Sequence, residues 1–197
     1  ALLQGIAQST AWSVIHLTLI FALLLIFAAL LVVTLTTEGE PGATVARFAC
    51  LAALLGGTLM LVSTAMDGFA MNQLAWAWST ATLAEKASAL RIASALESAQ
   101  YAVYSLSVAI FLGLGIFLYG STTVLSSGYP RVLGWLAMLS GAGALVVGVA
   151  QVLGGPEFRD TEIFFVLFSM VSTIWVFVMG VLMWRKARQD HPEEIKR

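Results

Sequence analysis

The sequence predicts an all-α integral membrane protein, a bundle of five transmembrane helices with an amphipathic segment at the outer interface. Of the 197 residues, 59% are hydrophobic and only 11% are charged, whereas about a quarter of the residues in a soluble domain are charged. A bilayer core needs only about 20 apolar residues per helix. No Asp, Glu, Lys or Arg occurs in residues 1–37, 98–130, 132–156 or 163–184, and residues 41–66 contain only Arg47.

These stretches predict five spans in a single membrane domain that covers residues 1–197. The first apolar run has no basic residues before it, so we interpret it as a retained span rather than a cleaved signal peptide. The net charge of −1 argues against a nucleic-acid partner and leaves the lipid bilayer as the expected surroundings. The spans are expected at about residues 11–35, 43–66, 101–125, 131–153 and 162–184.

Five spans place the two ends of the chain on opposite sides of the membrane. Arg185, Lys186 and Arg188 directly follow the last span, and loops rich in Lys and Arg usually face the cytoplasm. We therefore expect a multi-pass protein of the cell inner membrane, with its N-terminus outside and with residues 185–197 as a cytoplasmic tail.

Residues 67–100 form the only long connection and are expected on the outer side. Asp67-Gly68 is expected to make a turn where the second span leaves the membrane. Trp76 and Trp78 follow, and such rings favour the headgroup region. Together they predict a short amphipathic helix that lies on the outer interface.

The second half of this connection is rich in Ala, Leu and Glu, which predicts a helix. Thr82 and Glu85 have the spacing of a capping box at its start. No proline occurs between this point and Pro130. We therefore expect the helix to continue into the third span as one rod that projects from the membrane.

Small residues repeat along the third and fourth spans, where they let helices approach closely. In the third span the repeat is Ser105, Ala109 and Gly113, and a tight turn containing Pro130 joins the two spans. This pattern predicts an antiparallel hairpin; alternatively, the bare face of the fourth span binds an apolar ligand or a partner subunit. That face consists of Gly134, Ala137, Gly141, Ala144, Gly148, Gln151 and Gly155.

The turn and helix start from Tyr129 to Leu136 read Tyr-Pro-Arg-Val-Leu-Gly-Trp-Leu. This motif, with Asp67-Gly68 near the end of an earlier span and His16 within the first, resembles small bacterial membrane proteins of the DUF4386 type. The resemblance covers about half of the chain, although members of that family typically have more predicted spans. It implies a multi-span fold and no particular activity.

Polar side chains within a membrane are candidates for function, and the predicted topology gathers them near one surface. At 1.5 Å per residue, they fall within about 10 Å of depth of the outer interface. We therefore predict an outward-facing groove that binds an apolar ligand, a lipid or a partner membrane subunit. The residues expected around it are His16, Asp67, Trp76, Trp78, Tyr101 and Gln151.

His16 and Asp67 are the pair with the clearest chemistry, because a carboxylate that accepts from an imidazole fixes its tautomer and raises its basicity. Three interpretations remain open: a bond that pins the first span to the second, a proton or ligand site, or a metal site. The second allows the alternative function of a small membrane enzyme or proton-coupled carrier that uses this pair as its acid and base. No cofactor and no metal are expected, because no spacing motif supplies further ligands.

Overall fold

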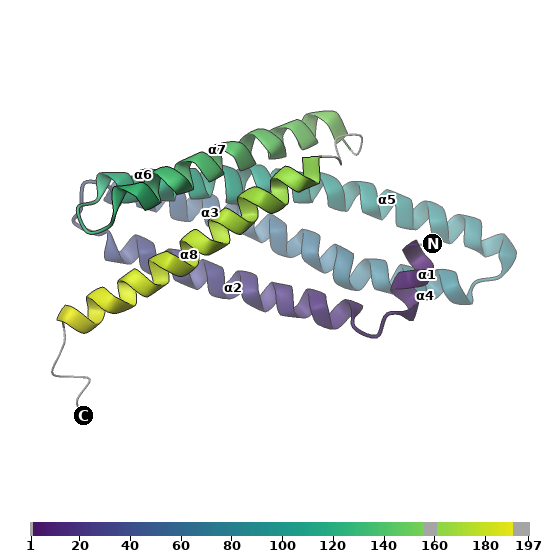
Figure 1. The fold of residues 1–197 in the computed structure, drawn as a ribbon. Helices are drawn as coiled ribbons and strands as arrows, with labels where there is room; N and C mark the ends of the chain where they lie inside the picture. The colour runs from purple at the N-terminus through teal and green to yellow at the C-terminus, as the bar shows by residue number, and fades with distance from the viewer. Residues whose placement is uncertain (1, 156–160, 191–197) are drawn as a thin grey trace, which may run out of the picture.

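Figure 1 shows the computed structural model, which describes residues 2–155 and 161–190; every element of these residues is a helix. The five long helices have the length and composition to cross a membrane, so the predicted fold class is confirmed. The predicted tail over residues 185–197 is described only as far as Asp190. The elements in chain order are α1 (Leu2–Gln8), α2 (Trp12–Thr36), α3 (Ala43–Ala65), a π-helical segment η1 (Met66–Met71), α4 (Asn72–Thr80), α5 (Leu83–Ser107), a second π-helical segment η2 (Val108–Gly115), α6 (Ile116–Leu125), α7 (Arg131–Gly154) and α8 (Glu162–Asp190).

Two of the five helices are far longer than a bilayer requires. The second runs for 38 residues, Ala43–Thr80, and the third for 43 residues, Leu83–Leu125. At 1.5 Å per residue they extend about 57 and 65 Å, roughly twice the thickness of a hydrocarbon core. Their joined ends therefore project from the bundle as a helical hairpin, on which α1 packs (Figure 1).

The prediction of a turn at Asp67-Gly68 is wrong. The backbone remains helical through η1 and α4, and it reverses only at Ala81 and Thr82, whose ψ angles of 151° and 163° are extended. Trp76 and Trp78 therefore lie on a continuation of the second helix rather than on a separate one.

The predicted start of the third helix is confirmed. The carboxylate of Glu85 accepts hydrogen bonds from the backbone N–H of Thr82 at 3.0 Å and from its hydroxyl at 2.7 Å. From there the helix runs without interruption to Leu125, as the absence of proline predicts.

The glycine face of α7 packs against the third helix, which confirms the predicted antiparallel hairpin. A Cβ at Gly148 would lie 2.5 Å from the backbone nitrogen of Ala109, and one at Gly141 would overlap with the backbone of Phe117. Helix backbones are in direct contact there, which only small residues allow. Gly155 has a different role, because its φ of 63° ends the helix.

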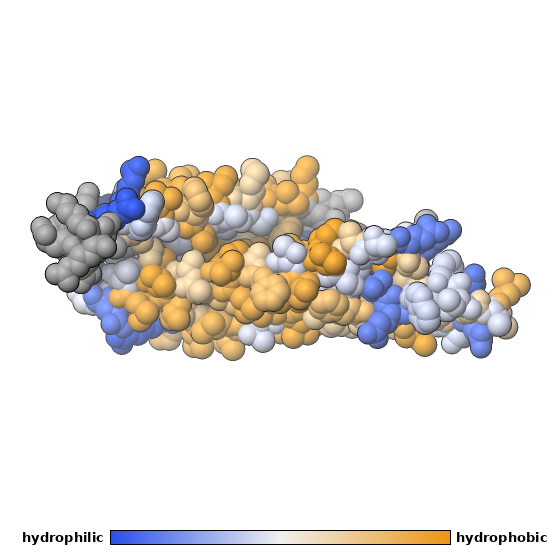
Figure 2. Space-filling model, turned by 90° about the horizontal axis from the view of Figure 1, so that it is seen from below, coloured by the Kyte–Doolittle hydropathy of each residue, from blue (hydrophilic) through white to orange (hydrophobic). Residues whose placement is uncertain are grey.

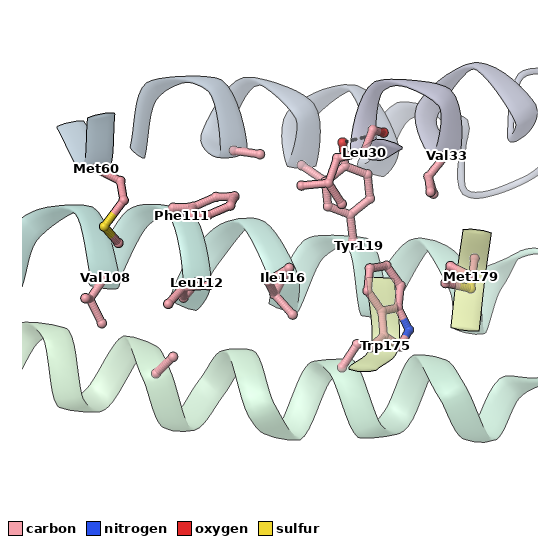
Figure 3. Packing of buried hydrophobic residues seen from close by; sticks show 14 of the residues in the cluster. Leu30, Val33, Met60, Val108, Phe111, Leu112, Ile116, Tyr119, Trp175 and Met179 are labelled. Carbon is pink, nitrogen blue, oxygen red and sulfur yellow. Dashed lines mark hydrogen bonds between the residues drawn. The ribbon is translucent and has the colours of Figure 1, made fainter. Parts of the chain in front are cut away.

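The core lies between the third helix and the helices around it (Figure 3). Tyr119 is fully buried, and its hydroxyl lies 3.0 Å from the backbone oxygen of Leu30 and 2.9 Å from Oγ1 of Thr34. Trp175 of α8 lies against the same ring, with 6.3 Å between the centroids. The third helix is thus the central one, whereas α2 and α8 expose most of their apolar side chains.

The surface has the pattern of a membrane protein. Figure 2 shows a wide hydrophobic middle section with hydrophilic residues gathered toward the two ends. Large apolar side chains such as Leu25 and Phe177 are more than two-thirds exposed, which is suited to hydrocarbon rather than to water. The protein is therefore an all-α membrane protein.

Candidate functional site

His16 and Asp67 contact each other across two helices. His16 lies in the second turn of α2, and Asp67 lies in η1. Nε2 of His16 and Oδ2 of Asp67 are 3.1 Å apart. The imidazole side chain is 11% exposed and the carboxylate side chain is 39% exposed. The pair is therefore covered at the imidazole and open at the carboxylate.

Hydrogen bonds between η1 and the first turn of α2 hold these residues together. A π turn bonds to the fifth residue instead of the fourth, and two backbone oxygens of η1 accept further hydrogen bonds from side chains of α2. The indole N–H of Trp12 donates to the backbone oxygen of Asp67 at 3.0 Å, and the hydroxyl of Ser13 donates to that of Gly68 at 3.2 Å. Asn72 in turn donates to the hydroxyl of Ser13 at 2.9 Å.

Gly68 is the point of closest approach between η1 and α2. A Cβ at this position would overlap with Cβ of His16 and would lie 2.6 Å from its Cγ. The absence of a side chain therefore lets the carboxylate of the preceding residue, Asp67, reach the imidazole. The glycine serves close approach rather than the turn that the sequence suggested.

The second ring nitrogen of His16 is also paired. Nδ1 lies 2.8 Å from the backbone oxygen of Trp12, one turn earlier. A carbonyl oxygen only accepts hydrogen bonds, so Nδ1 carries a hydrogen. The indole ring of Trp12 lies beside the imidazole, with 4.8 Å between the ring centroids. The orientation of His16 is thus fixed by contacts on several sides.

The pair lies at one end of a cavity of about 380 Å³ between α2, α3, η1, α5, η2 and α8. His16 and Ile26 both line it, and ten residues of helix separate them, so the cavity follows α2 for about 15 Å. Leu19 and Thr173 line the cavity from α2 and α8 and are also exposed on the surface. The cavity therefore opens sideways between these two helices, which cross and diverge in Figure 1.

The two ends of the cavity differ in polarity. Beside His16 and Asp67 lie Ser63 and Gln100, and Nε2 of Gln100 donates to the hydroxyl of Ser63 at 3.0 Å. Other hydroxyls in the wall, such as that of Thr173, donate to their own helix backbone. The remainder of the lining is mainly apolar and includes Leu19, Leu23, Ile26, Phe111, Leu112 and Phe165.

The other predicted site residues lie outside this cavity. Trp76 is 66% exposed on α4, and Trp78 lines a smaller hollow beneath α1 with Lys86 over its ring. Tyr101 and Gln151 are buried; Gln151 donates to Thr161 at 3.0 Å. A role for these four in ligand binding stays a prediction, but the structure does not bring them together with His16 and Asp67.

Sequence reasoning passed over Ser63, Gln100 and Tyr104 as members of the site, although helical spacing could have found them. Side chains four residues apart share a helix face. Ser63 precedes Asp67 by four residues, and Tyr104 follows Gln100 by four, whereas Tyr101 points in another direction. Ring contact between Tyr104 and Phe165, with centroids 5.2 Å apart, closes one side of the cavity.

Among the side chains that the structure describes, no three of His, Cys, Asp or Glu come together as a metal ion requires. Comparison of the chain with known protein families, curated proteins and solved structures finds no match. The resemblance to the DUF4386 type therefore stays a prediction. Fold and site define the class: a helical membrane protein with an elongated cavity that has one polar end.

Proposed function

We propose that the protein binds an apolar ligand, a lipid or a lipid-like molecule, in the cavity between α2 and α8. The observation that carries this proposal is the division of the cavity into a polar end, at His16 and Asp67, and a longer apolar part. Ligand sites in proteins typically have volumes of about 300–1,000 Å³, mostly apolar walls and a few polar groups that fix orientation. The cavity meets each of these criteria.

The sideways opening supports entry from the bilayer. Leu19 and Thr173 border the opening on helices whose outer surfaces are apolar. A ligand dissolved in the membrane then reaches the cavity without passing through water. In the predicted orientation, the polar end lies near the outer surface and the apolar end near the middle of the bilayer, which matches the orientation of a lipid in the outer leaflet.

The glycine face of α7 does not support the alternative of a partner subunit. Gly141 and Gly148 already contact the third helix, so this face is covered within the chain. The sequence left open that this face binds a ligand or a partner subunit. Because the face is covered, we assign the binding of a ligand to the cavity.

The proposal is tested by native mass spectrometry of the protein purified in a mild detergent. We expect a copurified lipid-like mass in the unchanged protein and its loss in Leu23→Trp, which fills the cavity. Leu25→Trp is the matched control, because Leu25 lies on the same helix but is 72% exposed on the outer surface. Equal retention of the mass by both variants, or its absence from the unchanged protein after incubation with lipid extract, contradicts the proposal.

A second candidate function rests on the 3.1 Å contact between His16 and Asp67 at the cavity wall. We infer that this contact also suits a proton-coupled carrier or a small membrane enzyme, because it holds an acid and a base together. In that case Asp67→Asn abolishes transport or turnover while binding persists. If the pair serves only to bind the ligand, the unchanged protein shows neither transport nor turnover for Asp67→Asn to abolish.

A further inference from the structure

The hydrogen bonds of His16 and Asp67 determine how many protons the pair holds. Nδ1 of His16 donates to the backbone oxygen of Trp12, so that nitrogen carries a hydrogen. Nε2 faces Oδ2 of Asp67 at 3.1 Å. Ionised carboxylate oxygens and unprotonated ring nitrogens only accept, so this contact requires a second hydrogen between the two atoms. The pair is either imidazolium with carboxylate or imidazole with carboxylic acid, and its net charge is zero in both cases.

The neutral pair leaves specific hydrogen-bonding groups for a ligand. Oδ1 of Asp67 makes no hydrogen bond among the described residues, and the carboxylate is the exposed member of the pair. The hydroxyl of Ser63 accepts from Gln100 and donates to no described residue. Ser63 and Asp67 are four residues apart, and such Cβ atoms lie about 5–6 Å apart on one helix face. One acceptor and one donor therefore lie side by side at the polar end.

Charge balance then selects the head group of the ligand. An ammonium group would add an uncompensated positive charge, or would need the proton that joins His16 to Asp67 to leave. A carboxylate or phosphate would lie against Oδ1 of Asp67, and no Lys or Arg lines the described cavity to balance it. Unpaired charges in an apolar site are costly. A hydroxyl is uncharged and both donates and accepts, as the wall requires.

We infer that the ligand of this cavity is an uncharged lipid alcohol, with its hydroxyl between Asp67 and Ser63 and its apolar body along Leu23 and Ile26. This inference rests on the proposed function, because it names the class of ligand for the same cavity. The other titratable side chain in the lining is Tyr104, four residues beyond Gln100.

The inference is tested with four probes that share one chain of twelve carbons: 1-dodecanol, dodecyl methyl ether, dodecylamine and dodecanoic acid, each labelled with tritium. Their binding is measured on the protein in lipid nanodiscs at pH 7, with empty nanodiscs to subtract partition into lipid. We expect 1-dodecanol to bind about tenfold more tightly than the ether, which cannot donate, and than either charged probe. This ratio corresponds to about one hydrogen bond to a charged or buried partner.

Two substitutions at Asp67 sharpen the test. The amide of Asp67→Asn donates to Nε2 of a neutral His16 and keeps an oxygen acceptor, so we expect dodecanol affinity within about threefold of that of the unchanged protein. Asp67→Leu removes the acceptor, and we expect a loss of about tenfold. Elution of each variant as a single species in size-exclusion chromatography shows that it is folded.

The outcomes separate the inference from the proposed function. Equal or tighter binding of the ether, the amine or the acid overturns the assignment of an alcohol and leaves the cavity as a lipid site. Failure of all four probes to bind above the level of Leu23→Trp overturns the proposed function as well. Strong loss of dodecanol binding in Asp67→Asn also overturns the inference, because it shows that a charge is required.

Discussion

Replacement of Gly68 by alanine tests the role assigned to this glycine at the contact between η1 and α2. The added Cβ would overlap with Cβ of His16 and would lie 2.6 Å from Cγ, whereas ordinary carbon contacts are about 3.5–4.0 Å. The two helices must therefore separate by about 1 Å. That displacement stretches three hydrogen bonds: His16 to Asp67 at 3.1 Å, Trp12 to the backbone of Asp67 at 3.0 Å and Ser13 to the backbone of Gly68 at 3.2 Å.

The magnitude follows from these contacts. Each hydrogen bond contributes about 0.5–1.5 kcal/mol, and alanine recovers about 1 kcal/mol of helix propensity relative to glycine. The expected net loss is therefore about 2 kcal/mol in the free energy of unfolding. For a chain of this size, 1 kcal/mol corresponds to about 2–4 °C, so the melting temperature should fall by roughly 4–8 °C.

The assay is thermal denaturation of the purified protein in detergent, with the folded fraction at each temperature measured by size-exclusion chromatography. Gly180→Ala is the matched control, since Gly180 lies within α8 and a Cβ there meets no atom within 4 Å. We expect this control to melt at or above the temperature of the unchanged protein. If Gly68→Ala melts no lower than Gly180→Ala, the close approach at Gly68 does not hold His16 against Asp67, and the role assigned to this glycine is refuted.

Two further predictions concern the packing around the third helix. Gly148→Leu should destabilise the bundle by about 2 kcal/mol or more, because the new side chain meets the backbone of Ala109. The control Gly180→Leu should be close to neutral. Similar melting temperatures for the two variants would contradict the hairpin contact. Tyr119→Phe should cost about 1 kcal/mol, because it removes a paired buried hydroxyl. Tyr101→Phe should be neutral or stabilising, since that hydroxyl has no partner among the described residues; an equal loss in both variants would refute the assignment.

The architecture is predictable because a charge-free run of sufficient length has few structures open to it in a membrane. The bounds of α2 and α7, Trp12–Thr36 and Arg131–Gly154, lie close to the predicted spans. The capping pair at Thr82 and the glycine repeat of α7 are local patterns, and both are found where the sequence predicts them. Each of these patterns can be recognised from residues within one or two turns of a helix.

The cavity could not be predicted in the same way. Its shape depends on how α8 crosses α2, and that crossing is set by contacts such as those of Trp175 with Tyr119, more than fifty residues away in the chain. The predicted depth of the polar residues was useful, because it placed Asp67 near His16. Depth does not specify which face of a helix points inward, however, and so the sequence predicts Tyr101 in the site instead of its neighbour Gln100.

Asp67-Gly68 shows most clearly why local chemistry was insufficient. The dipeptide favours a turn, yet the chain continues as a helix whose backbone oxygens at Asp67 and Gly68 accept from Trp12 and Ser13, each fifty-five residues away. Polar backbone groups are costly in an apolar setting unless they are paired, so these two long-range bonds stabilise the helix at this position. The same first turn of α2 positions His16. Backbone pairing and the site are therefore one arrangement, and a change that disrupts the π turn should also disrupt the polar end of the cavity.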